Sequence, residues 1–209
     1  MNDVAAVSEG IGSVFATRLD GLQGKGLANA AAALSSELNS RLERRGDLVD
    51  ERIRRYEKAF EAAGHRCPLG PQLRGVRRTG LPGKLPLVDA LLFHELTHGV
   101  LMGVQDAGPI EGGLVFSAAR AGDGYRGMRG PVTCSAGEPV LRDDRGIIAS
   151  VFQGPDARTH LTRRTTDVVL LAFGIGDVAP SEVSEGFEAL EAFLAPFAAE
   201  PPARLIEAT

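Results

Sequence analysis

Apolar residues recur at helical spacing through the first part of the chain. Over about 27–44 they lie three or four positions apart, which places them on one face of a helix. Gly46 is expected to end this helix. A second amphipathic helix is predicted over about 49–63, with Gly64 at its C-cap, and a short helix over 71–78. The residues of the first apolar face are Leu27, Ala31, Leu34, Leu38 and Leu42.

The stretch 86–98 is more apolar than these helices. Between Leu87 and Phe93 every residue except Asp89 is hydrophobic. Pro86 stands at its start, where a proline fits the first turn of a helix. We therefore expect a buried helix here.

Strand patterns dominate the second part of the chain, although one short strand is predicted earlier, at 11–19. A strand is expected to start at 112–116. Two runs, 139–142 and 146–152, flank a polar turn and predict a hairpin. The continuous apolar run 167–173 predicts a buried strand.

The chain is predicted to close with a helix over 183–194, for which Ser181 is a reasonable N-cap. A loose tail is expected from Pro201. Helices in the first half and strands in the second indicate an α+β fold rather than alternating βαβ units. We expect a single domain over 1–209, with a helical part at about 1–85 and a pocket and sheet part at about 86–200.

The composition indicates the cellular compartment of the protein and shows an uneven distribution of charge. The hydrophobic fraction of 44% supports a real core, and Cys67 and Cys134 are interpreted as free thiols of a cytoplasmic protein. There is no signal-peptide pattern and no run of ~20 apolar residues, so no membrane partner is expected. Residues 41–84 hold 12 Lys/Arg against 6 Asp/Glu, although the net charge is −4.

This basic segment is compatible with a phosphate-bearing partner. A solvated, salt-bridged helix surface is the simpler interpretation of such a charge run. If the segment binds a tRNA backbone, the arginines that would contact it are Arg52, Arg55, Arg74, Arg77 and Arg78.

The chemistry-bearing motif is His94-Glu95-Leu96-Thr97-His98, which matches H-E-x-x-H. On a helix, His94 and His98 lie one turn apart and are able to bind one Zn²⁺, with Glu95 beside the open position of the metal. The motif looks like the zinc helix of thermolysin-type metallopeptidases. His160 is the first candidate for a third ligand, followed by Glu111 or Asp106. Alternatively, His94 is a core histidine and His98 caps the end of the helix.

Short motifs follow one another in order from residue 49 onward. They are Ile53–Phe60, Gly80-Leu81-Pro82, Pro86–Asp89, a helix closing at Asp106, Ile110–Val115, Asp143-Asp144, Arg158–Thr162 and Thr165–Leu171. In this order and spacing they resemble the B3/B4 editing domain of the bacterial phenylalanyl-tRNA synthetase β subunit, and more closely the free-standing B3/B4 proteins. The resemblance implies a central β-sheet flanked by helices and a pocket that admits an aminoacyl group ester-linked to tRNA. In the synthetase, this domain hydrolyses tyrosine mischarged on the phenylalanine tRNA.

The chain departs from the family at its pocket. Leu92 and Glu95 stand where the family helix usually carries Asn and Ser, and Gly103 stands in place of a His. In the family, a Glu residue recognises the tyrosine hydroxyl, and the corresponding position of this sequence falls near Pro155 or Asp156. The family's catalytic residues are therefore not carried over. The predicted catalytic residues are Glu95 and His98, and the predicted substrate-binding residues are Leu92, Gly112, Gly113, Asp156 and Arg158.

Hydrolysis of an aminoacyl ester needs a positioned water, help with its proton and stabilisation of the oxyanion. Without a metal, Glu95 or His98 would position the water, and backbone N–H groups at Gly112-Gly113 would hold the oxyanion. With Zn²⁺, the metal would lower the pKa of the water to ~7. Both versions remain open at the level of sequence.

We therefore predict a hydrolase that removes an aminoacyl group from mischarged tRNA in trans, with tRNA or an aminoacyl small molecule as partner and no DNA partner. The alternative is a zinc-dependent enzyme that uses His94, Glu95 and His98 on a small amino-acid-derived substrate. A second alternative is a non-catalytic module that binds tRNA or an amino acid. A bound metal would favour the zinc-dependent enzyme over the predicted deacylase. Turnover would favour either enzyme over the non-catalytic module.

Overall fold

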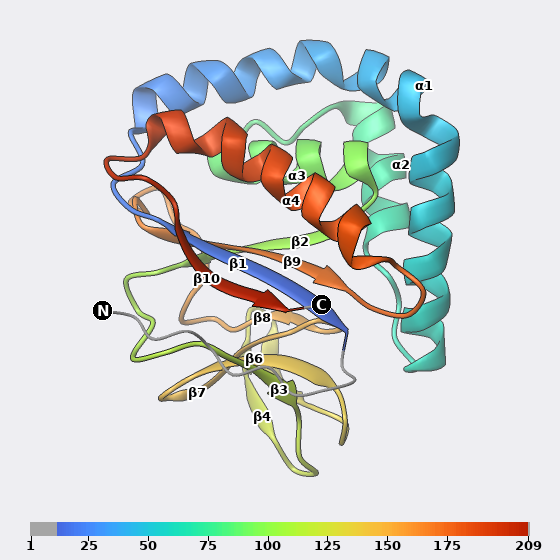
Figure 1. The fold of residues 1–209 in the computed structure, drawn as a ribbon, viewed down its shortest axis with the longest axis vertical. Helices are drawn as coiled ribbons and strands as arrows, with labels where there is room; N and C mark the ends of the chain where they lie inside the picture. Colours follow the sequence, from blue (N-terminus) through green and yellow to red (C-terminus); the bar gives the residue numbers. More distant parts are fainter. Residues whose placement is uncertain (1–11, 209) are drawn as a thin grey trace.

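The computed structural model describes residues 12–208, and its elements stack in three layers (Figure 1). Helices form one layer. A four-stranded antiparallel sheet of order β10-β1-β9-β2 lies in the middle, and a second four-stranded antiparallel sheet of order β3-β6-β7-β8 forms the third layer. Separate helices and antiparallel sheets place the chain in the α+β class, as predicted.

The helical layer contains one helix that the sequence predicted as two. Gly46 lies inside α1, so the predicted break there is wrong. The apolar stripe stays in phase across it, from Leu42 to Val49 and Ile53, and packing of that stripe outweighs the cost of about 1 kcal/mol for a glycine in a helix. Figure 1 shows α1 bending around the other helices. The helices are α1 (Gly24–Ala62), α2 (Leu69–Thr79), α3 (Pro86–His98), α4 (Pro180–Leu194) and the short 3₁₀ helix η1 (Ala195–Phe197).

The middle sheet is built around β9, all of whose residues are buried. The apolar helix 86–98 is confirmed as α3, and it shares one hydrophobic core with β9. The strands of this sheet are β1 (Ser13–Leu19), β2 (Leu101–Asp106), β9 (Val168–Gly174) and β10 (Ala203–Ala208). The start predicted for β1, Ile11, lies outside the described residues.

The second sheet contains the predicted hairpin, formed by β6 and β7. The carboxylate of Asp143 accepts the backbone N–H of Arg145 at 3.0 Å and that of Gly146 at 3.2 Å, which closes the turn between them. The strands are β3 (Val115–Ala118), β6 (Pro139–Asp143), β7 (Gly146–Ser150) and β8 (Gly154–Pro155), and a separate hairpin pairs β4 (Gly124–Gly127) with β5 (Gly130–Thr133).

Two predictions about the C-terminal part of the chain are wrong. The tail after Pro201 is not loose, because β10 pairs with β1 and buries Leu205 and Ile206. Ser181 is not the N-cap of α4. Ala179 holds that position, and its N–H is accepted by the carboxylate of Glu182 at 3.0 Å.

The region after α3 also differs from the expectation. The family resemblance placed the end of a helix at Asp106, but α3 already ends at His98. Gly99 adopts a left-handed conformation there (φ 65°), and β2 follows. Gly112 precedes β3 rather than starting it.

Cys67 and Cys134 are free thiols, as predicted. Among the described residues, no helix is long and apolar enough to span a membrane.

Candidate functional site

One stripe of α3 faces a cavity between the layers. Val88, Leu91, Leu92 and Glu95 all line this cavity, and they are spaced i, i+3, i+4 and i+7 along the helix. Residues at this spacing lie on one side of a helix. Leu92, predicted to bind substrate, and Glu95, predicted to be catalytic, therefore both line this cavity, and their roles stay predictions.

The middle sheet forms the floor of the cavity. Leu101, Gly103 and Gln105 alternate along β2 and line the cavity, and Leu171 on β9 pairs with Gly103. A side chain at Gly103 would point into this space, because alternate residues of a strand face the same side. An ideal Cβ at Gly103 would lie 3.8 Å from its nearest neighbours, so the position has room and the missing side chain enlarges the cavity.

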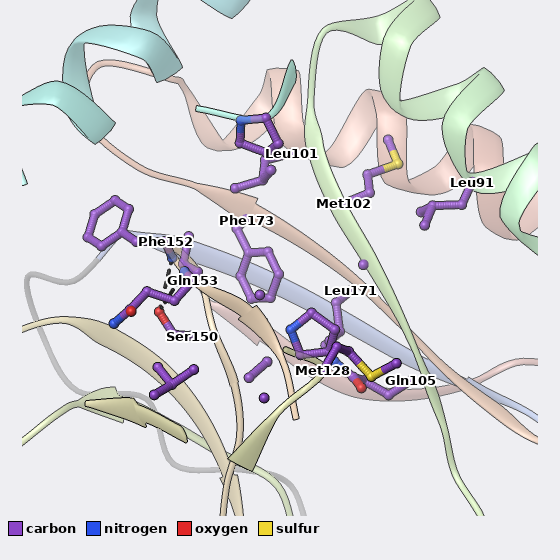
Figure 2. A pocket seen from close by; sticks show the side chains of 18 of the residues that line it. Leu91, Leu101, Met102, Gln105, Met128, Ser150, Phe152, Gln153, Leu171 and Phe173 are labelled. Carbon is purple, nitrogen blue, oxygen red and sulfur yellow. Dashed lines mark hydrogen bonds between the residues drawn. The ribbon is translucent and has the colours of Figure 1, made fainter. Parts of the chain in front are cut away.

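The second sheet and the β4–β5 hairpin close the other side. Figure 2 shows Met128 from the hairpin, together with Ser150 at the end of β7 and Phe152 in the turn that follows, around the same space as Leu171 and Phe173. The cavity has a volume of about 830 Å³. This lies within the range of small-molecule sites, and the lining is mostly apolar.

Glu95 is the only acidic residue of the described chain that lines this cavity. Its exposed fraction is 3%, and its Oε1 accepts the backbone N–H of Met102 at 3.0 Å. Burial raises the pKa of Glu95 to about 8, against the opposing effect of the Met102 hydrogen bond. Near neutral pH the group is therefore able both to donate and to accept a proton, which suits general acid–base chemistry.

A second polar group, which the sequence did not point to, lies on the opposite wall. Ser150 Oγ donates to the buried carboxylate of Glu138 and accepts the N–H groups of Phe152 and Gln153, both at 3.1 Å. The side-chain amide of Gln153 also donates to Glu138 at 3.0 Å. Because its hydrogen-bonding capacity is used in this turn, we interpret Ser150 as holding the wall in place.

His94 and His98 do not line the cavity. The histidines instead lie on the neighbouring part of the helix surface, where His94 packs against α4. Their rings stack on each other at 5.8 Å, and His94 lies 5.4 Å from the ring of Phe193 on α4. Burial lowers the pKa of His94 to about 3 and also lowers the pKa of His98. Their neutral rings act as core packing here.

The structure does not bring His160 to this pair. His160 is exposed, and its Nδ1 lies 2.7 Å from the carbonyl oxygen of Ala157. In the part of the chain that the structure describes, no group of three or more His, Cys, Asp or Glu residues is arranged to hold a metal ion. His98 Nδ1 is also 2.9 Å from the carbonyl oxygen of His94. The residues present therefore do not make up the predicted ligand set, and zinc binding stays a prediction.

The remaining predicted substrate-binding residues lie outside the cavity lining. Arg158 forms a two-pronged ion pair with Asp143, at 2.8 and 3.0 Å. Gly112 has a positive φ of 71°, and a Cβ there would collide with the carboxylate of Asp144. Gly113 follows it in the same turn. These contacts give the loop its shape.

Asp156 acts on the cavity through an intermediate residue. Its Oδ1 accepts both the backbone N–H of Thr159 at 2.8 Å and the hydroxyl of Thr159 at 2.6 Å. The same hydroxyl lies 2.5 Å from the side-chain amide of Gln105, which lines the cavity. Asp156 therefore fixes the position of Gln105 without lining the cavity itself.

Part of the basic segment is used inside the fold. Arg52 has an exposed fraction of 4% and donates to the carbonyl of His98 at 2.9 Å and to Glu182 at 3.1 Å. Arg55 pairs with Glu182 at 2.7 Å. The expectation that Arg52 contacts a tRNA backbone is wrong because α4 covers it. The arginines of α2 that were predicted with it, Arg74, Arg77 and Arg78, are exposed.

The layers and the cavity define an α+β protein with a largely apolar cavity into which one carboxyl group projects from a helix. No protein-family model and no curated protein matches the sequence. Among solved structures, the chain is similar to an N-terminal fragment of the phenylalanyl-tRNA synthetase β subunit from Pyrococcus horikoshii, with 15% identity and a TM-score of 0.48. The match covers 55% of this chain and 41% of that fragment, so it spans less than half of the fragment's length.

Proposed function

We propose that this protein hydrolyses an aminoacyl ester, with the acyl group inside the cavity and Glu95 as the general base. The observation that carries the proposal is the position of Glu95: a buried carboxyl group with a pKa of about 8 that lines a mostly apolar cavity. The order of motifs that resembles the B3/B4 editing proteins supports an aminoacyl-tRNA as the ester. The reaction then occurs in trans on a mischarged tRNA.

The reaction follows from the ionisation of Glu95. The carboxylate accepts a proton from a water molecule as that water attacks the ester carbonyl carbon. The C–O bond to the ribose then breaks, and the protonated Glu95 gives this proton to the ribose oxygen, which regenerates the carboxylate. The hydrogen bond from Met102 holds Oε1, which leaves Oε2 for the water. This division fixes the direction from which the water attacks.

The cavity also defines the kind of acyl group. A volume of about 830 Å³ with Leu91, Leu92 and Phe173 in its walls favours a large apolar or aromatic side chain over a small polar one. A charged side chain would lose its hydration in the apolar interior, because Glu95 is the only buried ionisable residue that lines the cavity in the described part of the chain, and the two arginines of the lining, Arg66 and Arg129, are exposed.

The zinc alternative has less support from this geometry. His94 and His98 pack against α4, whereas Glu95 lines the cavity, so the motif does not present its three polar residues to one space. Metal analysis of purified protein, together with melting curves with and without Zn²⁺, tests that alternative.

The direct test is hydrolysis of a panel of aminoacyl-tRNAs by the wild type, by Glu95→Gln and by Glu61→Gln, which changes an exposed carboxylate on α1. The wild type should hydrolyse esters of large apolar amino acids fastest. Glu95→Gln should lower kcat by about 10²–10⁴, and Glu61→Gln should match the wild type. No turnover of any ester by the wild type would refute hydrolysis and leave a binding module.

A further inference from the structure

Two arginines line the mouth of the cavity, and the fold does not use either of them. Arg66 lies in the connection between α1 and α2, and Arg129 lies in the turn between β4 and β5. Both are exposed. Among the described residues, neither forms an ion pair or a side-chain hydrogen bond. Together with Glu95 they are the ionisable residues that line the cavity in the described part of the chain.

Other arginines of this protein show what a structural role looks like. Arg52 and Arg55 pair with Glu182 across α1 and α4, Arg142 pairs with Asp123, and Arg158 pairs with Asp143. Each of these side chains joins two segments of the chain. Arg66 and Arg129 join nothing, so their charges are available to a bound molecule.

The backbone at both positions is held in place. Next to Arg66, the ring of His65 stacks on Phe152 at 5.4 Å with an angle of 9° between the planes, and Cys67 is buried. The cavity wall therefore fixes the segment that carries Arg66.

The hairpin that carries Arg129 is tied to the second sheet. Tyr125 donates its hydroxyl to the carbonyl of Gly154 at 2.6 Å, and the N–H of Ala157 donates to the carbonyl of Arg126 at 2.7 Å. Met128, at the tip beside Arg129, also lines the cavity, and 56% of its surface is exposed. The tip thus presents an apolar side chain and a cation at the same entrance.

We propose that Arg66 and Arg129 bind the phosphodiester backbone next to the esterified terminal ribose, so that the cavity selects acyl groups carried by an RNA 3′ end. This inference rests on the proposed ester hydrolysis. An acyl group that enters the apolar interior leaves its carrier at the entrance, where the two cations lie. An RNA end carries phosphates at that position, whereas a free amino acid ester carries none.

The test compares two substrates with the same acyl group, an aminoacyl-tRNA and the corresponding aminoacyl ester of unphosphorylated adenosine. Arg66→Gln and Arg129→Gln should each raise KM for the aminoacyl-tRNA by about fivefold, the worth of an exposed charge pair, and leave kcat unchanged. Neither substitution should affect the adenosine ester. Arg44→Gln, which removes an exposed cation from α1 away from the cavity, is the matched control and should have no effect.

A binding measurement keeps the inference testable without turnover. Fluorescence anisotropy of a short labelled RNA ending in CCA should show binding to the wild type at low salt. The slope of log affinity against log salt should fall by about 0.7 for each of the two substitutions. Competition by inorganic phosphate as strong as by unlabelled RNA, at equal phosphate concentration, would assign the cations to a free anion and overturn the proposal.

The outcomes separate this inference from the proposed function. If both esters are hydrolysed equally well and the substitutions behave like Arg44→Gln, ester hydrolysis stands and the phosphate contact is wrong. If no ester is hydrolysed but RNA binding depends on Arg66 and Arg129, the proposed function is wrong and the phosphate contact stands. No RNA binding by the wild type at low salt would overturn the phosphate contact.

Discussion

At the scale of single residues, Glu95 combines two properties that usually exclude each other. It is buried in an apolar region, yet it faces space that a substrate is able to enter. A buried acid costs stability whenever it ionises, and this cost is the same effect that raises its pKa. Stability and activity therefore depend on the same proton.

Glu95→Gln should make the stability of the protein less dependent on pH. The pKa of Glu95 rises from 4.5 in the unfolded chain to about 8 in the folded protein. The stabilisation by its proton is therefore complete below 4.5 and is lost as pH rises through about 8. Over this window the free energy of unfolding of the wild type should fall by up to about 1.4 kcal/mol per pH unit more than that of the variant. Urea unfolding at several pH values measures the difference, and parallel curves would contradict the burial of this group.

At the scale of elements, α1 and α4 are joined by buried arginine contacts. Arg52 reaches Glu182, Glu185 and the carbonyl of His98 at the end of α3. This single side chain therefore connects three helices.

Arg52→Ala should lower the free energy of unfolding by about 1–3 kcal/mol, because it leaves the buried carbonyl of His98 without its side-chain donor and removes one of the two arginines that pair with Glu182. Arg54→Ala, two residues away on the exposed side of α1, should change it by less than about 0.5 kcal/mol. Thermal or chemical unfolding of the two variants side by side gives the answer. Equal effects would mean that the contact of Arg52 with α4 contributes nothing.

Gly103 on β2 controls the room in the cavity. Gly103→Ala should be tolerated, since its Cβ meets only ordinary contacts at 3.8 Å. Gly103→Leu should fill part of the cavity and lower kcat/KM for large acyl groups by about 10–200-fold, with an unfolding midpoint close to that of the wild type. Hydrolysis rates for one large and one small aminoacyl ester check this. A Leu variant that keeps full activity on the large ester would place the substrate elsewhere.

At the scale of the whole molecule, the sequence pattern predicted the α+β class, helix 86–98, the hairpin of β6 and β7, and the buried strand β9. These elements have long or regular apolar patterns. The strands β4, β5 and β8 have four residues or fewer and are too short to show such a pattern, although their partner strands are close in the sequence. The edge strand β10 contains charged residues and pairs with β1, which is far away in the sequence, so no local pattern indicates it.

The candidate site was predictable only in part. Leu92 and Glu95 were predicted because they stand where the family that the sequence resembles carries pocket residues, and Glu95 is also part of the H-E-x-x-H motif. The direction of the α3 stripe that carries them depends on packing against α4, which turns His94 and His98 away from the cavity. The rim arginines Arg66 and Arg129 come from two loops far apart in the sequence, and no local pattern indicates that they meet at one entrance.

The central claim is that Glu95 acts as a base in this cavity, and its pH–rate profile tests this most directly. The value of kcat/KM for a large apolar aminoacyl ester is measured from slightly acidic to alkaline pH, after subtraction of uncatalysed hydrolysis, for the wild type and Glu95→Gln. Because the base must be ionised, the wild-type rate should rise with pH and level off above an apparent pKa of about 8. Glu95→Gln should lack this titration and be slower by about 10²–10⁴. The same profile and rate in both proteins would contradict the claim.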